Sequence, residues 1–213
     1  MHVHEHREEI VNVLTHGLGA LASVAGGAVL ITLAAVYGEI WQIVGASVFC
    51  ASLLLLYSAS TLYHAVRHEL LRARLKVFDH CAIYVLIAGT YTPFMLGDLR
   101  GPWGWSLFGV IWVLAVAGII FKLFFTGRLR TLSTLMYIAM GWLAVVAIVP
   151  MLRELPVSAL VWLLAGGVTY TVGTAFYHCR WPYAHAIWHL FVLGGSVCHF
   201  AAVLTQVMPG AFA

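Results

Sequence analysis

Two histidines four positions apart, His185 and His189, lie in the segment PYAHAIWHLF at residues 182–191. The segment otherwise reads as the beginning of a long apolar helix. Four residues are slightly more than one helical turn, so both imidazoles point the same way and lie close enough to hold one metal ion. Histidine is also found near lipid head groups, because its ring has an apolar body and a polar tip. The pair alone therefore indicates either a metal site or an interfacial position.

The composition indicates an integral membrane protein. Of the 213 residues, 62% are hydrophobic and 9% are charged, whereas an average soluble domain has about 25% charged residues. Seven apolar runs are long enough to cross about 30 Å of hydrocarbon. They lie roughly at residues 17–37, 41–64, 77–96, 104–125, 131–151, 157–177 and 184–207. The short connectors between them predict an all-α bundle of seven transmembrane helices.

The positive charges predict how this bundle is oriented. Nine of the eleven Lys and Arg residues fall in the N-terminal tail or in connectors on the same side of the membrane, and the other two are Arg100 and Arg153. By the positive-inside rule the N-terminus is cytoplasmic and the C-terminus is outside. The net charge of +3 follows from this topology, so no nucleic-acid partner is expected. We expect a short tail at residues 1–16, one transmembrane domain at 17–207 and a short tail at 208–213.

A third metal ligand should come from the same depth as the histidine pair. The second apolar run ends at His64, with Ser60 one turn deeper on the same helical face. Asp79 lies near the start of the third run and is the single acidic residue that we place within an apolar run. Ionisable residues inside a membrane are expensive and are functional candidates by default. These polar groups, distant in sequence, are therefore predicted to converge on one layer.

His178 and His80 are alternative third ligands. The sixth run ends in TAFYH, which echoes STLYH at the end of the second run, so His178 mimics His64. His80 follows Asp79 and points about 100° away from it around the helix axis, so one of the two faces away from the site. The sequence pattern leaves the choice open. Three further histidines lie in the N-terminal tail, where a solvated segment is the simpler prediction: His2, His4 and His6.

Three neutral imidazoles match a catalytic zinc site, because they leave one of four tetrahedral positions open to water. Zinc lowers the pKa of that water toward about 7. Asp79 could accept a proton from the water or hold it in place, and Ser60 could orient Asp79 or a substrate oxygen. This chemistry suits hydrolysis of an amide or an ester, and the depth predicts a lipid substrate. The alternatives are an ion pair of Asp79 with Arg74 or Lys76, and a Ser60 hydroxyl bonded to its own helix.

The order and spacing of these residues resemble the signature of the progestin and adipoQ receptor family, in particular its bacterial hemolysin III branch. The resemblance covers nearly the whole chain. It rests on Ser60-x-x-x-His64, on Asp79 and on His185-x-x-x-His189. The opening segment EEIVNVLTH is similar to the first motif of the family, which would correspond here to Glu8 or Glu9, Asn12 and His16.

The resemblance implies a seven-helix bundle with an intramembrane zinc ion held by His64, His185 and His189, and with Asp79 and Ser60 beside the zinc water. The animal adiponectin receptors imply ceramidase-like amide hydrolysis of a membrane lipid. The bacterial branch carries the label of a pore-forming hemolysin. A cytolysin, or a non-enzymatic membrane receptor or regulator with a structural zinc ion, is therefore the alternative. The resemblance also implies a multi-pass protein of the bacterial inner membrane.

Overall fold

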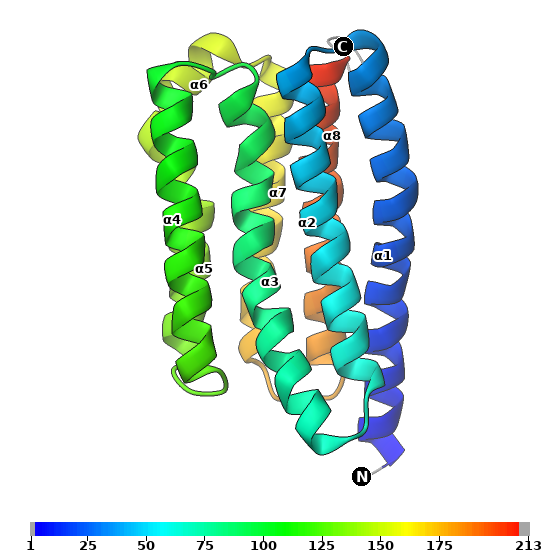
Figure 1. Cartoon of the computed structure of the whole chain (residues 1–213). Helices are drawn as coiled ribbons and strands as arrows, with labels where there is room; N and C mark the ends of the chain where they lie inside the picture. The colour runs from blue at the N-terminus through cyan, green and yellow to red at the C-terminus, as the bar shows by residue number, and fades with distance from the viewer. Residues whose placement is uncertain (1–2, 209–213) are drawn as a thin grey trace.

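The computed structural model describes residues 3–208, with side chains described from His6 onward. These residues form helices and connections, and no strand occurs among them. The helices, with one 3-10 helix labelled η1, are α1 (Val3–Tyr37), α2 (Ile40–Ala65), α3 (Glu69–Leu96), α4 (Pro102–Phe125), α5 (Arg130–Gly141), η1 (Leu143–Ala147), α6 (Ile148–Glu154), α7 (Val157–His178) and α8 (Ala184–Val207). They form an elongated bundle in which α1 begins at the end opposite to the one where α8 ends (Figure 1).

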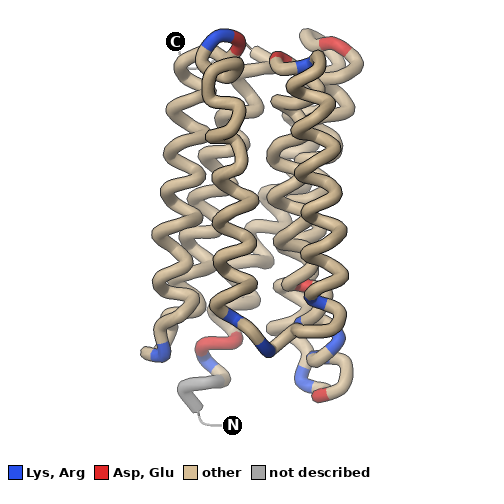
Figure 2. Tube along the Cα trace, turned by 90° about the vertical axis from the view of Figure 1, so that its left-hand side faces the viewer, with Lys and Arg blue, Asp and Glu red and all other residues tan. Residues whose placement is uncertain are grey.

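The bundle has the surface of a membrane protein. Six helical segments of the described chain are long and apolar enough to cross a membrane, namely His6–Tyr37, Ile40–Ala65, Pro102–Phe125, Arg130–Glu154, Val157–His178 and Ala184–Val207. Large apolar side chains are exposed on the outside, for example Leu21 at 69%, Phe124 at 72% and Val157 at 75%. Charged residues gather mainly toward the two ends, and most Lys and Arg lie at the end where α1 begins (Figure 2). The prediction of an all-α membrane protein is confirmed.

The helices follow the predicted apolar runs closely, with two extensions. α1 begins at Val3 and not near residue 17, so residues 3–16 continue the helix. α3 begins at Glu69, and the connection from α2 is therefore only residues 66–68. The charged segment ELLRARLK is helical because Leu, Arg, Lys, Glu and Ala all have high helix propensity. His68 caps this helix, since its Nδ1 accepts a hydrogen bond from the backbone N–H of Leu71 at 3.4 Å.

The fifth apolar run, predicted as one helix over residues 131–151, is broken in the structure. α5 ends at Gly141, and η1 and α6 follow it. The Tyr91 hydroxyl of α3 inserts at the break. It donates to the carbonyl oxygens of Met140 and Gly141, both at 2.9 Å, and accepts from the backbone N–H of Ala144 at 2.8 Å. A side chain inserted into the hydrogen-bond ladder is a usual cause of such a kink.

The packing of five helices positions the predicted site residues. α2 packs against α1 and α3, and α8 packs against α7 and α1. α2 and α3 approach closely at Gly45, where an added Cβ would lie 2.7 Å from the Cα of Pro93. Small residues allow this kind of backbone approach between membrane helices. The packing brings the end of α2 and the start of α8 together at the end of the bundle where α1 begins (Figure 1).

Candidate metal centre

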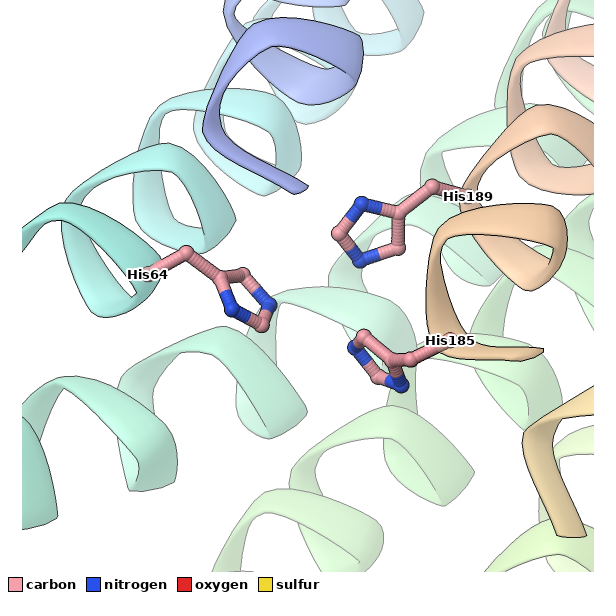
Figure 3. A group of neighbouring side chains, drawn as sticks. All are labelled: His64, His185 and His189. Atoms are coloured by element: carbon pink, nitrogen blue, oxygen red, sulfur yellow. The ribbon is translucent and has the colours of Figure 1, made fainter. Parts of the chain in front are cut away.

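Three histidines from two helices converge at this end of the bundle. His64 lies in the last turn of α2, and His185 and His189 lie in the first two turns of α8. Each offers one ring nitrogen, and the three nitrogens all lie within 4.8 Å of one another. The rings point into a common space (Figure 3). The spacing of four residues in α8 therefore does place two imidazoles on one face, and His64 faces them from α2.

Nδ1 of His64 is held by the carboxylate of Glu9. Its Nδ1 lies 2.6 Å from Oε2 of Glu9 in α1, and a carboxylate only accepts hydrogen bonds, so Nδ1 carries the proton. The other Glu9 oxygen pairs with the guanidinium of Arg72. This leaves Nε2 of His64 as a lone-pair donor. It is buried and has no hydrogen-bond partner, which is the state expected of a nitrogen that faces a metal ion.

His189 is held in the same way by a hydroxyl. Its Nδ1 lies 3.1 Å from Oγ1 of Thr15. The Thr15 hydroxyl proton is directed to backbone carbonyls of its own helix, Val11 at 2.9 Å and Asn12 at 3.0 Å, so the oxygen accepts from His189. Nε2 of His189 is then the nitrogen that remains for a ligand. Two of the three histidines thus have their tautomer fixed by side chains of α1.

His16 lies directly behind the metal-facing group. Its ring stacks on that of His189, with ring centroids 3.5 Å apart and an interplanar angle of 10°. The edge of Tyr57 packs against it at 5.0 Å. Both nitrogens of His16 are buried without a hydrogen-bond partner, and the residue is 3% exposed. The His16 ring therefore restricts the position of the His189 ring from behind.

Asp79 and Ser60 lie next to each other on α3 and α2. The two side chains line the same cavity as the two histidines of α8. Ser60 is 1% exposed and the Asp79 side chain is 14% exposed. Within residues 3–208 Asp79 forms no ion pair with Arg74 or Lys76. The catalytic roles predicted for Asp79 and Ser60 stay predictions.

The alternative third ligands lie outside the cluster. His80 donates through Nδ1 to the carbonyl of Lys76 at 2.6 Å, and its Nε2 lies 3.3 Å from the Tyr177 hydroxyl. His178 is exposed, and its Nε2 lies 3.0 Å from Oγ1 of Thr134. Both rings therefore have other partners. The three N-terminal histidines are largely outside the described residues: His2 and the His4 side chain are not described, and His6 lies against Arg67 at 3.3 Å.

A cavity of about 450 Å³ lies beside the histidines. Its wall includes Ser60, Asp79 and the two histidines of α8. Much of the wall comes from apolar and aromatic side chains of several helices, among them Ile83, Leu86, Ile87, Tyr91, Ile138, Trp142, Tyr170, Trp188 and Val192. A wall that combines ionisable groups with many apolar side chains suits a ligand with a head group and a hydrocarbon chain.

Sequence reasoning assigned no role to Glu9 or Thr15. The pattern does hold a signal, because Glu9, Asn12 and His16 recur at helical spacing and so form one polar face on α1. The prediction left Glu8 and Glu9 as equivalent candidates, and the structure selects Glu9 as the partner of His64. The signal was obscured because residues 1–16 were predicted to be a tail and not the first turns of a helix.

Comparisons with known proteins agree with the motifs. Residues 4–200 match the family model described as Haemolysin-III related. The chain is 49% identical over 199 residues to the hemolysin-3 homolog of Bacillus subtilis (strain 168), which covers 93% of each chain. It is 49% identical over 206 residues to hemolysin-3 of Bacillus cereus, covering 96% of this chain and 94% of that one. The human monocyte to macrophage differentiation factor is 27% identical over 205 residues, covering 92% of this chain and 83% of the human one.

These matches confirm the family resemblance seen in the motifs, including the distant relation to the progestin and adipoQ receptors. Together with the six apolar helices, they indicate a multi-pass membrane protein, which in bacteria resides in the plasma membrane. Three histidines that could hold a metal ion lie inside the matched region. The chain belongs to the haemolysin-III-related family.

Proposed function

We propose that the protein is a metal-dependent hydrolase of an amide or ester bond in a membrane lipid, with zinc bound by His64, His185 and His189. The observation that carries this proposal is the free, buried Nε2 of His64, which faces the two histidines of α8 while its Nδ1 is held by Glu9. A donor set of three imidazoles, two of them with the tautomer fixed by a hydrogen bond to the outer ring nitrogen, is that of a catalytic zinc site.

The proposed topology has seven membrane passes, with α3 as the additional one. α3 has 28 residues, which is enough for a membrane helix of about 20 residues. It is more polar than the other six because it contributes Asp79 and several hydroxyl groups. An odd number of passes agrees with the opposite positions of the start of α1 and the end of α8 (Figure 1). The excess of Lys and Arg at the α1 end favours a cytoplasmic N-terminus and a site near the cytoplasmic face.

The residues of the chain divide the work of hydrolysis between them. Zinc, when bound, supplies the activation of water at neutral pH. Asp79 accepts the proton of the attacking water, and Ser60, which lines the same cavity, orients the Asp79 carboxylate. Glu9 and Thr15 keep the rings of His64 and His189 in the ligating orientation. The apolar part of the cavity holds the acyl chain and excludes water from it.

The substitution Asp79→Asn tests the proposal. It keeps the size of the side chain and removes the proton acceptor, a role that contributes typically about 10²- to 10⁴-fold. We expect acyl release from a long-chain N-acyl lipid to fall by this factor, with the zinc content nearly unchanged. His189→Ala should lower both the zinc content and the rate. The assay is fatty-acid release from reconstituted bilayers, with zinc measured on the same samples.

Pore formation is the second candidate function, and the names of the two Bacillus relatives favour it. Leakage of a vesicle-trapped dye from the same reconstituted samples separates the two. If fully metallated wild type cleaves no lipid amide or ester, yet permeabilises vesicles to the same extent as Asp79→Asn, the hydrolase proposal is wrong. If neither activity is found and the histidine substitutions lower only thermal stability, the metal is structural, as in a receptor.

A further inference from the structure

The wall of the cavity carries four basic side chains but one carboxylate. The basic residues, which we call the basic mouth, are Lys76, Lys122, Arg128 and Arg130, and the carboxylate is Asp79. Lys76 lies on α3 and Lys122 in the last turn of α4. Arg128 lies in the connection between α4 and α5, and Arg130 is the first residue of α5. The cavity wall therefore has an excess of positive charge.

Lys122 is the buried member of the basic mouth, at 2% exposure. Its ammonium donates to the Ser133 hydroxyl at 2.7 Å and lies 5.5 Å from the centre of the Tyr137 ring. Among the residues described, Lys122 forms no ion pair with a carboxylate. A charged side chain inside a membrane bundle is expensive, and such residues mark places where an opposite charge or a ligand is met. An anionic ligand in the cavity would add negative charge to that of Asp79, the single carboxylate that faces the four cations.

The two arginines extend the positive charge to the surface of the bundle. Arg128 and Arg130 are exposed, and the guanidinium carbon of Arg130 lies 4.1 Å from the centre of the Tyr177 ring, which holds it against the protein. The connection between α4 and α5 lies at the same end of the bundle as the start of α1 (Figure 1). At a helix end the basic mouth is at the height of lipid head groups. Guanidinium groups bind phosphate through parallel N–H donors.

We propose that the basic mouth binds the phosphate of an acyl lipid with an anionic head group, while the acyl chain occupies the apolar part of the cavity. Phosphate is favoured because it offers several acceptor oxygens to several cations at once. A neutral head group would leave the four cations of the cavity wall facing the single carboxylate of Asp79. This inference rests on the proposed function, because it takes the cavity as the place where the lipid substrate binds. It adds that the substrate is a lipid with an anionic head group.

A competition between two lipids tests the inference with the purified full chain. Phosphatidylglycerol and phosphatidylcholine with identical acyl chains are offered at equal concentration in detergent, and the bound lipids are identified by native mass spectrometry. We expect phosphatidylglycerol to be bound at least about tenfold more often than phosphatidylcholine. Both lipids offer a phosphate to the buried Lys122 ammonium, but phosphatidylcholine also brings the positive charge of its choline group next to the basic mouth. Lys122→Met should remove this preference, and Arg130→Gln, at an exposed position, should weaken it several-fold.

Arg180→Gln is the matched control. Arg180 is an exposed arginine in the connection between α7 and α8 that does not line the cavity, so its loss should leave the preference unchanged. Equal binding of the two lipids by wild type, or the same loss in Arg180→Gln as in Lys122→Met, would overturn the inference. If Lys122→Met does not fold, Arg130→Gln decides by the same comparison.

Inorganic phosphate provides the third arm of the experiment. We expect it to displace phosphatidylglycerol only weakly, since it lacks the acyl chain that fills the apolar part of the cavity. Displacement at concentrations equal to those of the lipid would assign the basic mouth to a free anion, and the lipid inference would be wrong. A fatty acid of equal chain length is tested as a competitor in the same way, to compare binding of a carboxylate with binding of a phosphate. Tighter binding of the fatty acid than of phosphatidylglycerol would also overturn the inference.

Failure of this inference and failure of the proposed function give different results. A preference for phosphatidylglycerol that depends on Lys122, without release of acyl chains from any lipid, supports the binding site and removes the hydrolase. Release of acyl chains that depends on Asp79, with equal binding of the two lipids, supports the hydrolase and removes the anionic substrate class. Acyl release and metal content are therefore measured on the same preparations.

Discussion

The nitrogen atoms of two histidines show how single residues prepare this site. Nδ1 of His64 is held by Glu9, and Nδ1 of His189 is held by Thr15. Both partners come from α1, whereas the histidines lie on α2 and α8. When Nδ1 of a histidine is held by a hydrogen bond, Nε2 points in one direction. The ring then loses less conformational freedom when it binds a metal ion. α1 therefore acts as a support for the ligands although it supplies none of the three.

The metal content of histidine variants should follow the geometry of the cluster. We expect the purified protein to carry about one zinc ion per chain, as a three-histidine site does. His64→Ala should reduce this content sharply, whereas His178→Ala should leave it unchanged, because His178 is exposed and bonded to Thr134. The content is measured by inductively coupled plasma mass spectrometry. Equal losses in the two variants would mean that His64 is not the third ligand.

Glu9 should control metal affinity without being a ligand. Glu9→Gln keeps a hydrogen-bond acceptor for His64 and removes the charge, and losses of about 10- to 100-fold in metal affinity are typical for partners of this kind. Glu8→Gln is the matched control, because the neighbouring carboxylate has no contact with the histidines in the described structure. Affinity is measured by competition with a zinc indicator. A similar loss in both variants would point to the summed charge of α1 and not to the Glu9–His64 contact.

At the scale of helices, the contact between α2 and α3 sets the distance between His64 and Asp79. The two helices approach at Gly45 and Pro93, toward the opposite end from the metal centre. Ser60 on α2 and Asp79 on α3 line the same cavity. The packing of α2 against α3 therefore brings two polar groups from different segments to one cavity wall.

The close approach at Gly45 predicts a large cost for the smallest side chain. An added Cβ would lie 2.7 Å from backbone of Pro93, so Gly45→Ala should destabilise the protein by about 1–3 kcal/mol through overpacking. Gly109→Ala is the control, because nothing lies within 4 Å of a Cβ there, and alanine should stabilise that helix by up to about 1 kcal/mol. Thermal unfolding in detergent can be followed with a thiol-reactive dye, since Cys50 and Cys81 are buried and free. Equal midpoints for the two variants would contradict the tight contact.

The whole molecule is a bundle with one strongly basic end. That end holds the start of α1, the end of α2 and the connection between α4 and α5 (Figures 1 and 2). It also holds the histidine cluster and the basic mouth. Most positive charges and the three histidines that could hold a metal ion therefore lie at the same end of the bundle.

The orientation of the chain should place residue 70 in the cytoplasm and residue 213 outside. The reason is the nine-to-two distribution of Lys and Arg between the two sides. Reporter fusions at these two positions, one fluorescent in the cytoplasm and one enzymatically active outside it, measure the orientation. If both reporters indicate the same side, the chain makes an even number of passes, and the proposal that α3 crosses the membrane is wrong.

The sequence by itself determined the fold class, the places of most helices and the three histidines that the structure brings together. A helix satisfies its own backbone hydrogen bonds in lipid and needs about 20 consecutive apolar residues to cross the membrane, so each spanning helix appears in the sequence as a long apolar run. His185 and His189 share a face because helical periodicity is local. His64 was one of three candidate third ligands by pattern, and only the family resemblance selected it.

The tertiary structure decided what depends on contacts between helices. The break after Gly141 arises from the Tyr91 hydroxyl of α3, and the choice of Glu9 over Glu8 arises from its distance to His64. The burial of Lys122 beside the same cavity as Asp79 likewise follows from packing. Periodicity reports which side of a helix a residue occupies, but not which helix lies opposite. For this reason the sequence could name the three histidines, while their supports and the basic mouth emerged only from the folded bundle.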